Sequence, residues 1–161
     1  MKQESGITLI EIVMVMVLIG LVVPPLLGMF SDVTKKSAQA ELISTANSLA
    51  RSLLEEIVSK EYDENGSSPW SNPLGPDSGE SSRNNYDDMD DFDGFSESSI
   101  SGFPGFSRTA VVYYVNPDDS DLDTPQPDSY NTLDYKRVDV VISHSLIGNT
   151  TMSSVISRSH F

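Results

Sequence analysis

The stretch GITLIEIVMVMVLIGLVVPPLLGMF, residues 6–30, decides the fold of this chain. After Glu11 it contains no charged side chain until Asp32, and about 17–25 apolar residues are enough for a helix to span a bilayer. We therefore expect residues 7–31 to form a transmembrane helix. A secretory signal peptide fits less well, because its apolar core is only about 7–15 residues long and the single Ala-x-Ala, residues 38–40, lies well beyond the run.

Glu11 lies inside this apolar segment, about one helical turn from its start. A carboxylate in hydrocarbon is costly and is usually paired or functional, and a plain membrane anchor gives no reason for it. The run GITLIE, residues 6–11, resembles the processing motif of type IV prepilins and of the pseudopilins of type II secretion. Its glycine, short polar leader, glutamate offset and uncharged run occur together in that family.

The resemblance implies a processing site and an assembly site. In this family a membrane peptidase cuts after the glycine and the new N-terminal residue is methylated, which here implies cleavage between Gly6 and Ile7 and N-methylation of Ile7. Glu11 would then meet the free amine of an adjacent subunit in a filament. Such a pair favours the correct axial register, because a slipped neighbour would leave both charges unpaired. The chain has Ile7 where the family usually carries phenylalanine.

The resemblance also implies partners and a location. The partners are other pilin subunits, a prepilin peptidase, the inner-membrane assembly machinery and membrane lipid. The chain would be a single-pass protein of the bacterial inner membrane with its head in the periplasm, and part of a pilus after assembly. The formal net charge of −14 disfavours nucleic acid as a partner.

The helix is expected to continue beyond the membrane to about residue 60 and to fray near residues 62–66. Gly20, Pro24 and Pro25 predict a kink or a melted turn near residues 20–25, because proline removes a backbone donor and clashes with the preceding turn. Beyond Asp32 the pattern becomes amphipathic. The apolar stripe predicted to pack on a sheet comprises Leu42, Ala46, Leu49, Leu53 and Ile57, with Ile43, Ala50 and Leu54 beside them.

The C-terminal third reads as three strands, at residues 108–115, 135–143 and 150–157. Gly148 and Asn149 are expected to form the turn between the last two strands. The predicted fold class is α+β and pilin-like: a long N-terminal helix, membrane anchor plus amphipathic stalk, packed on a small antiparallel sheet. The predicted parts are the cleaved leader 1–6, the transmembrane and assembly helix 7–31, the amphipathic helix 32–62, an acidic irregular loop region 63–107 and the sheet-bearing head 108–161.

The acidic middle of the chain carries the segments PWSNPLGP (69–76), DDMDDFDG (87–94) and FPGF (103–106). With LLEEI (53–57), YDEN (62–65) and YKRV (135–138), they resemble the minor pilin-like MshD proteins of mannose-sensitive haemagglutinin pilus systems. This resemblance implies a minor pilin of that pilus type. A minor pseudopilin of type II secretion and an anchored surface-binding module remain the alternatives.

The aspartates of DDMDDFDG raise the question of a cation site. Hard cations such as calcium take about six to eight oxygen ligands, and the calcium candidates are Asp87, Asp88, Asp90, Asp91 and Asp93. Their spacing does not match an EF-hand loop, and a solvated acidic loop is the favoured interpretation. No cofactor is expected beyond this calcium hypothesis. The aromatic residues of the region are expected to pin it to the head: Trp70, Phe92, Phe95, Phe103 and Phe106.

Catalytic motifs are absent from the sequence. The chain has no cysteine, its two histidines are His144 and His160, and it contains neither a Gly-x-Ser-x-Gly elbow nor a phosphate-binding Gly-x-x-x-x-Gly-Lys loop. The sequence therefore predicts a protein that is not an enzyme. The same lack of cysteine means that no disulfide can brace the long middle segment.

Overall fold

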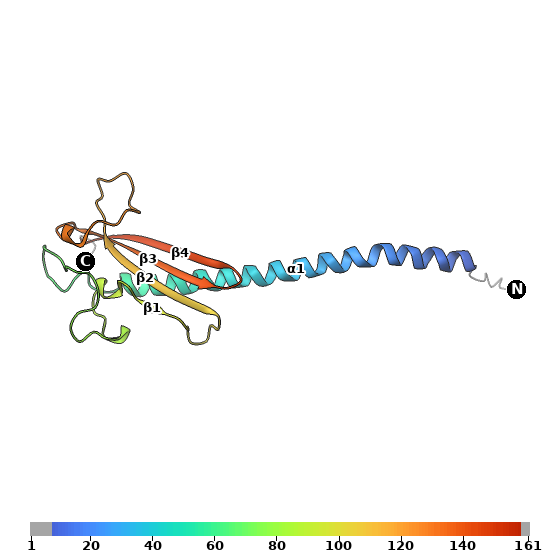
Figure 1. Cartoon of the computed structure of the whole chain (residues 1–161), viewed down its shortest axis with the longest axis horizontal. Coiled ribbons are helices and arrows are strands. Elements are labelled where there is room, and N and C mark those ends of the chain that lie inside the picture. The colour runs from blue at the N-terminus through green and yellow to red at the C-terminus, as the bar shows by residue number, and fades with distance from the viewer. Residues whose placement is uncertain (1–7, 159–161) are drawn as a thin grey trace. The chain divides into compact units, whose positions relative to one another are not determined.

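The computed structural model describes residues 8–158 and has an α+β fold (Figure 1). Helix α1 spans Leu9–Val58, and the strands are β1 (Ser96–Glu97), β2 (Phe106–Tyr114), β3 (Tyr135–His144) and β4 (Gly148–Ser157). Three short 3-10 helices lie in the loops, η1 (Arg83–Asn85), η2 (Asp90–Phe92) and η3 (Asp128–Tyr130). The chain divides into two compact units, of which the first ends at Glu41 and the second begins at Leu42.

In the first unit, α1 is continuous through Gly20, Pro24 and Pro25. Of the two expected outcomes, a kink or a melted turn, the melted turn is therefore wrong. Proline at positions 24 and 25 leaves the carbonyls of Gly20 and Leu21 without their usual donors four residues on, but a long membrane-type helix tolerates such losses because the turns on both sides keep their own hydrogen bonds. α1 is long and apolar enough to cross a membrane.

The second unit is built on one antiparallel sheet with the strand order β1-β2-β3-β4. The three predicted strands are confirmed within two residues, and β1, only two residues long, was not predicted. The predicted turn at Gly148 and Asn149 is wrong, because these residues open β4 and pair with His144 and Ser143. The turn comprises residues 145–147, and Gly148 follows it with a φ of +76°, a conformation that favours glycine.

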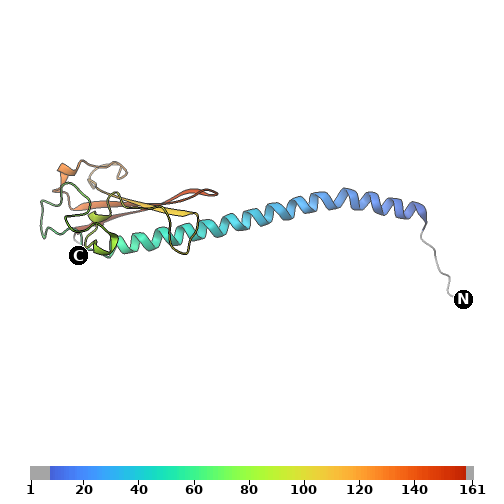
Figure 2. The same ribbon diagram turned by 60° about the horizontal axis from the view of Figure 1, so that its bottom comes forward.

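The last part of α1, residues 42–58, runs along one face of this sheet (Figures 1 and 2). The predicted apolar stripe is confirmed at five positions, and the helix ends at Val58, slightly earlier than expected. Ile43 is 47% exposed and does not belong to the core. The buried helix residues are Ala46, Leu49, Ala50, Leu53 and Ile57, and the sheet contributes Ala110, Val112, Val138, Val140 and Ile142.

The predicted pinning of the middle segment by aromatic residues is confirmed for four of the five. Trp70, Phe92 and Phe106 are buried and Phe95 packs against the same core, whereas Phe103 is 41% exposed. The core of the second unit is therefore assembled from three sources, the helix, the sheet and an irregular segment. A small domain gains stability from such added apolar burial.

Leu53 provides a test of this packing. It is fully buried, so we expect Leu53→Ala to lower the free energy of unfolding by about 2–5 kcal/mol. Ile43→Ala, on the exposed side of the same helix, should change it by about 0.5 kcal/mol or less. The measurement is urea unfolding of the detergent-extracted chain followed by the fluorescence of Trp70, the only tryptophan. Equal effects of the two substitutions would contradict the packing described.

Candidate functional sites on the helix and in the head

The first part of α1 exposes an apolar surface all around the helix. Every large apolar side chain from Leu9 to Val33 is between 42% and 83% exposed. Soluble proteins rarely leave so large a continuous apolar surface in water. This segment is therefore a candidate membrane span, with a surface that suits lipid.

Glu11 is the only ionisable side chain of the described residues before Asp32. Its backbone N–H donates to the carbonyl of Thr8 at 3.1 Å, and the Thr8 hydroxyl lies 3.4 Å from the same nitrogen, as in a helix N-cap. Among the described residues, no hydrogen bond or ion pair reaches the Glu11 carboxylate. The predicted processing residues Gly6 and Ile7 lie outside the described residues, as does His160.

In the unit that begins at Leu42, below called the head, the ammonium group of Lys136 is enclosed by three acceptors. Lys136 lies on β3 and is fully buried. Its Nζ donates to the Tyr62 carbonyl, to Oδ2 of Asp63 and to Oδ1 of Asp90, each at 2.8 Å. The rings of Tyr62 and Tyr114 lie 4.6 and 5.6 Å from Nζ. All three ammonium donors are therefore satisfied inside the protein.

Asp63 is held as an ionised carboxylate. Its Oδ1 accepts from the backbone N–H of Asn65 and from the hydroxyl of Ser71, both at 3.0 Å, and its Oδ2 accepts from the Ser71 N–H at 2.9 Å as well as from Lys136. Burial alone would raise the pKa of Asp63, but the hydrogen bonds from Lys136, Ser71 and Asn65 outweigh burial and lower it. Asp90 has less support, and burial raises its pKa even though Lys136 opposes the shift.

Two other aspartates of residues 87–94, below called the acidic segment, act as acceptors for the backbone of that segment. Oδ1 of Asp88 accepts from the N–H groups of Asp90 and Asp91, at 3.0 and 3.3 Å. Oδ2 of Asp91 accepts from the N–H groups of Asp87 and Asp88, at 2.9 and 3.2 Å. A buried irregular backbone has no ladder to satisfy its N–H groups. Short carboxylate side chains provide the acceptors instead.

Asp93 extends the same principle to the sheet. Its Oδ1 accepts from the N–H of Val112 on β2 at 3.0 Å. Because β1 is only two residues long, it pairs with Arg108 and Thr109 and does not reach Val112. The Asp93 carboxylate therefore accepts the hydrogen bond from the Val112 N–H that a longer strand would accept.

The favoured interpretation of this segment as a solvated acidic loop is wrong, since Asp88, Asp90 and Asp91 are at most 3% exposed. The structure also does not bring the five calcium candidates to one point. Carboxylate oxygens converge in two separate groups, Asp63 with Glu64 and Asp90, and Glu80 with Asp87 and Asp91. In the first group the Lys136 ammonium already provides the positive charge. Sequence spacing could not distinguish ligands of a cation from acceptors of backbone hydrogen bonds.

Asp88 is the most perturbed carboxyl group of the cluster. Burial, and then the neighbouring carboxylates of Glu64 and Asp90, raise the pKa of Asp88 to about 9. The pKa of Glu64 is lowered in return, chiefly by a hydrogen bond with Asp88. Near neutral pH the two side chains therefore hold one proton between them, bound mainly at Asp88.

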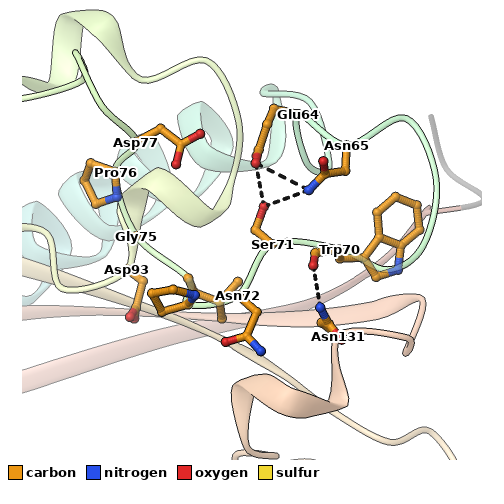
Figure 3. Close-up of a pocket in the computed structure, with 12 residues that line it drawn as sticks. Glu64, Asn65, Trp70, Ser71, Asn72, Gly75, Pro76, Asp77, Asp93 and Asn131 are labelled. Carbon is orange, nitrogen blue, oxygen red and sulfur yellow. Dashed lines mark hydrogen bonds between the residues drawn. The ribbon is translucent and has the colours of Figure 1, made fainter.

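A pocket of about 590 Å³ opens beside this cluster (Figure 3). At one side the Ser71 hydroxyl oxygen accepts from Nδ2 of Asn65, and its one proton is shared between Glu64 and Asp63. Asn131 donates to the Trp70 carbonyl at 2.7 Å. The lining carries three carboxylates, Glu64, Asp77 and Asp93, and no lysine or arginine. Such a lining disfavours an anionic ligand.

Lys136 and Asp63 were not predicted as site residues, although one signal in the sequence points to the lysine. Lys136 has the same parity along its strand as Val138, Val140 and Ile142, so a strand that buries these three residues also turns Lys136 inward. Its partners lie 46 and 73 positions away in the chain. No local pattern reveals contacts at such separations.

Comparison of the chain with protein-family models, with curated proteins and with solved structures finds no match.

The raised pKa of Asp88 predicts a pH-dependent stability. The folded head holds a proton that the unfolded chain, with a carboxyl pKa of 3.8, has already released. The contribution of Asp88 to the free energy of unfolding is therefore fully present below the unfolded pKa of 3.8 and should fall as the pH rises towards 9, by up to about 1.4 kcal/mol per pH unit. We expect a lower urea midpoint at about pH 8 than at about pH 6.

Glu64→Gln supplies the variant for this test. It removes the negative charge beside Asp88 and keeps an amide of similar size, so the decrease of the midpoint with pH should become smaller. Glu61→Gln, at an exposed position nearby, is the matched control and should behave like the unchanged protein. A midpoint that is independent of pH in the unchanged protein would rule out the protonated Asp88.

Proposed function

We propose that this chain is a minor pilin-like subunit of a type IV pilus of the mannose-sensitive haemagglutinin type. In this proposal a prepilin peptidase cuts between Gly6 and Ile7, and the subunit then assembles into the filament through the first part of α1. The single observation that carries the proposal is the isolated Glu11 carboxylate in a helix segment that is otherwise apolar and exposed.

The cost of that carboxylate supports an assembly role. A charged residue costs about 2.5–3.5 kcal/mol at the centre of a membrane helix on insertion scales, and Glu11, near one end of the apolar run, costs less but is still unfavourable in hydrocarbon. Lipid tails cannot offset this cost, and no described residue of the same chain pairs with Glu11. The amine created by cleavage before Ile7, on a neighbouring subunit, is a partner with the opposite charge that can enter an apolar bundle.

The position of Glu11 also suits this role. It lies in the first turn of α1, where the helix dipole favours a negative charge. An amine from an adjacent chain would therefore meet the Glu11 side chain near the start of the helix. Because both charges are costly when single, pairing would select one axial offset between neighbouring helices.

The compact unit that begins at Leu42 suits the remainder of a pilin-like subunit. It packs the end of α1 on a small antiparallel sheet, and most of its charged and polar side chains lie outside the core. A net charge of −14 favours solubility outside the membrane. This part of the chain would form the surface of the filament, whereas the apolar helices would form its interior.

Processing is tested by mass spectrometry of the chain extracted from bacterial membranes. The expected N-terminal peptide begins at Ile7 and carries one additional methyl group on its amine. Gly6→Val should retain residues 1–6, because a branched side chain replaces the residue without a side chain at the cleavage site. Recovery of the unchanged chain with residues 1–6 still attached would refute the processing step.

Assembly is tested by a pair of substitutions on one helix. Glu11→Gln removes the charge and keeps the shape, so we expect incorporation into sheared pili to fall at least tenfold, while the membrane pool and the Trp70 fluorescence of the head stay unchanged. Glu41→Gln, an exposed acidic position of α1 outside the apolar run, should incorporate normally. Normal incorporation of the Glu11→Gln chain, measured by immunoblotting of the pilus fraction, would favour an ordinary anchored protein.

A further inference from the structure

We propose that the head forms an internal amide bond between Nζ of Lys136 and the side-chain carboxyl group of Asp90, with release of one water molecule. Asp63 would relay the proton that this reaction must move. The bond would be a self-made covalent link between β3 and the acidic segment. It does not depend on whether the chain joins a filament.

The geometry brings the reacting groups together. Nζ of Lys136 lies 2.8 Å from Oδ1 of Asp90 and 2.8 Å from Oδ2 of Asp63. Cγ of Asp90, the carbon that Nζ must reach, is bonded to Oδ1, so this contact places the nitrogen beside the reacting carboxyl group. Groups held close together in this way gain the advantage of an intramolecular reaction. A rotation of the Asp90 carboxyl group about its Cβ–Cγ bond would turn the face of this group, rather than an oxygen, towards the nitrogen.

The surroundings exclude water from the three side chains. Lys136 and Asp63 have fully buried side chains, and that of Asp90 is 3% exposed. The rings of Tyr62 and Tyr114 lie beside the nitrogen. Condensation to an amide releases water, so a site without solvent favours the product and protects it from hydrolysis.

The charge balance of the cluster favours the same outcome. One ammonium group faces two carboxylates, and buried charges are costly even when they are paired. Amide formation removes one positive and one negative charge. The remaining amide N–H would still lie beside Oδ2 of Asp63, which keeps its hydrogen bonds from Ser71.

The hydrogen bonds identify Asp90 as the acyl partner. Both oxygens of Asp63 accept two hydrogen bonds each, which stabilises its ionised form. For Asp90, burial favours the neutral acid, and a carboxylic acid loses its hydroxyl as water more readily than a carboxylate loses an oxygen. Asp63 is then the proton acceptor that remains ionised.

The step balances without any further reagent. One proton of the Lys136 ammonium passes to the Asp90 carboxylate, which leaves an amine beside a carboxylic acid. The nitrogen lone pair forms the bond to Cγ of Asp90, and a second proton passes from the nitrogen through Asp63 to the departing hydroxyl. The carbon–oxygen bond breaks and water leaves. Lys136 keeps one N–H, and Asp63 is again a carboxylate.

Such a bond would tie together positions 46 residues apart in a chain that has no cysteine. It would keep the acidic segment on the sheet when the head is pulled or transiently opened, because the segment could no longer separate from β3.

Peptide mapping of the full-length chain, extracted in detergent and digested with trypsin after denaturation, tests the proposal. Residues 61–83, 84–108 and 109–136 are separate tryptic peptides in the unlinked chain. An amide at Lys136 blocks cleavage there, so the expected product is residues 84–108 joined to residues 109–137, lighter than the sum of the two by one water. Only unlinked peptides would overturn the proposal, and a link from residues 109–137 to residues 61–83 would overturn the assignment to Asp90.

Variants place the link. Asp90→Ala and Lys136→Met should each lose the joined peptide completely, whereas Asp118→Ala, at an exposed aspartate, should retain it. Trp70 fluorescence reports whether each variant folds. A joined peptide that persists in Asp90→Ala would also overturn the assignment, and the result with the unchanged chain decides the proposal even where a variant fails to fold.

Discussion

The hydrogen bonds of Lys136 hold together three parts of the head that are far apart in the sequence. The lysine belongs to β3, whereas its acceptors belong to the residues just after α1 and to η2. A fully buried ammonium group leaves no freedom in this arrangement, because each missing acceptor would leave a buried charge only partly satisfied. The end of the helix, the acidic segment and the sheet are therefore fixed relative to one another by one side chain.

Burial also explains why the acidic segment is rich in aspartate. It is irregular and yet buried, so its backbone N–H groups require acceptors that neither a helix nor a sheet provides. Aspartate is well suited to the task, because its short side chain reaches N–H groups two to four residues away. Asp88 and Asp91 each accept two such bonds from within the segment. The high density of aspartates thus has a structural explanation inside the protein, and the protonation of Asp88 limits the repulsion among them.

Periodic patterns in the sequence predicted the parts of the fold that depend on local physics. The apolar spacing of residues 42–57 predicted the buried face of α1, the Val and Tyr content of residues 108–115 predicted β2, and alternation predicted β3, while β4 had a weaker signal. The proline pair predicted a kink or a melted turn, and the melted turn is wrong because α1 continues through both prolines. The aspartates were predicted to lie in a solvated loop, because such a composition suggests solvent exposure. The burial of Asp90 depends instead on Lys136, which lies 46 positions away. The parity of Lys136 along β3 carried the one local clue to its burial.

The two acidic sites of the chain differ in where the partner of each charge comes from. In the described part of the chain, no buried side-chain nitrogen or oxygen lacks a hydrogen-bond partner, so the head satisfies its own charges. Glu11 has no such partner among the described residues. The apolar side chains around it are exposed. A lipid environment would cover those neighbours but would make the carboxylate more costly. A second polypeptide with an apolar surface and one positive charge would both bury the apolar side chains and pair with Glu11. For this reason we favour assembly over simple anchoring.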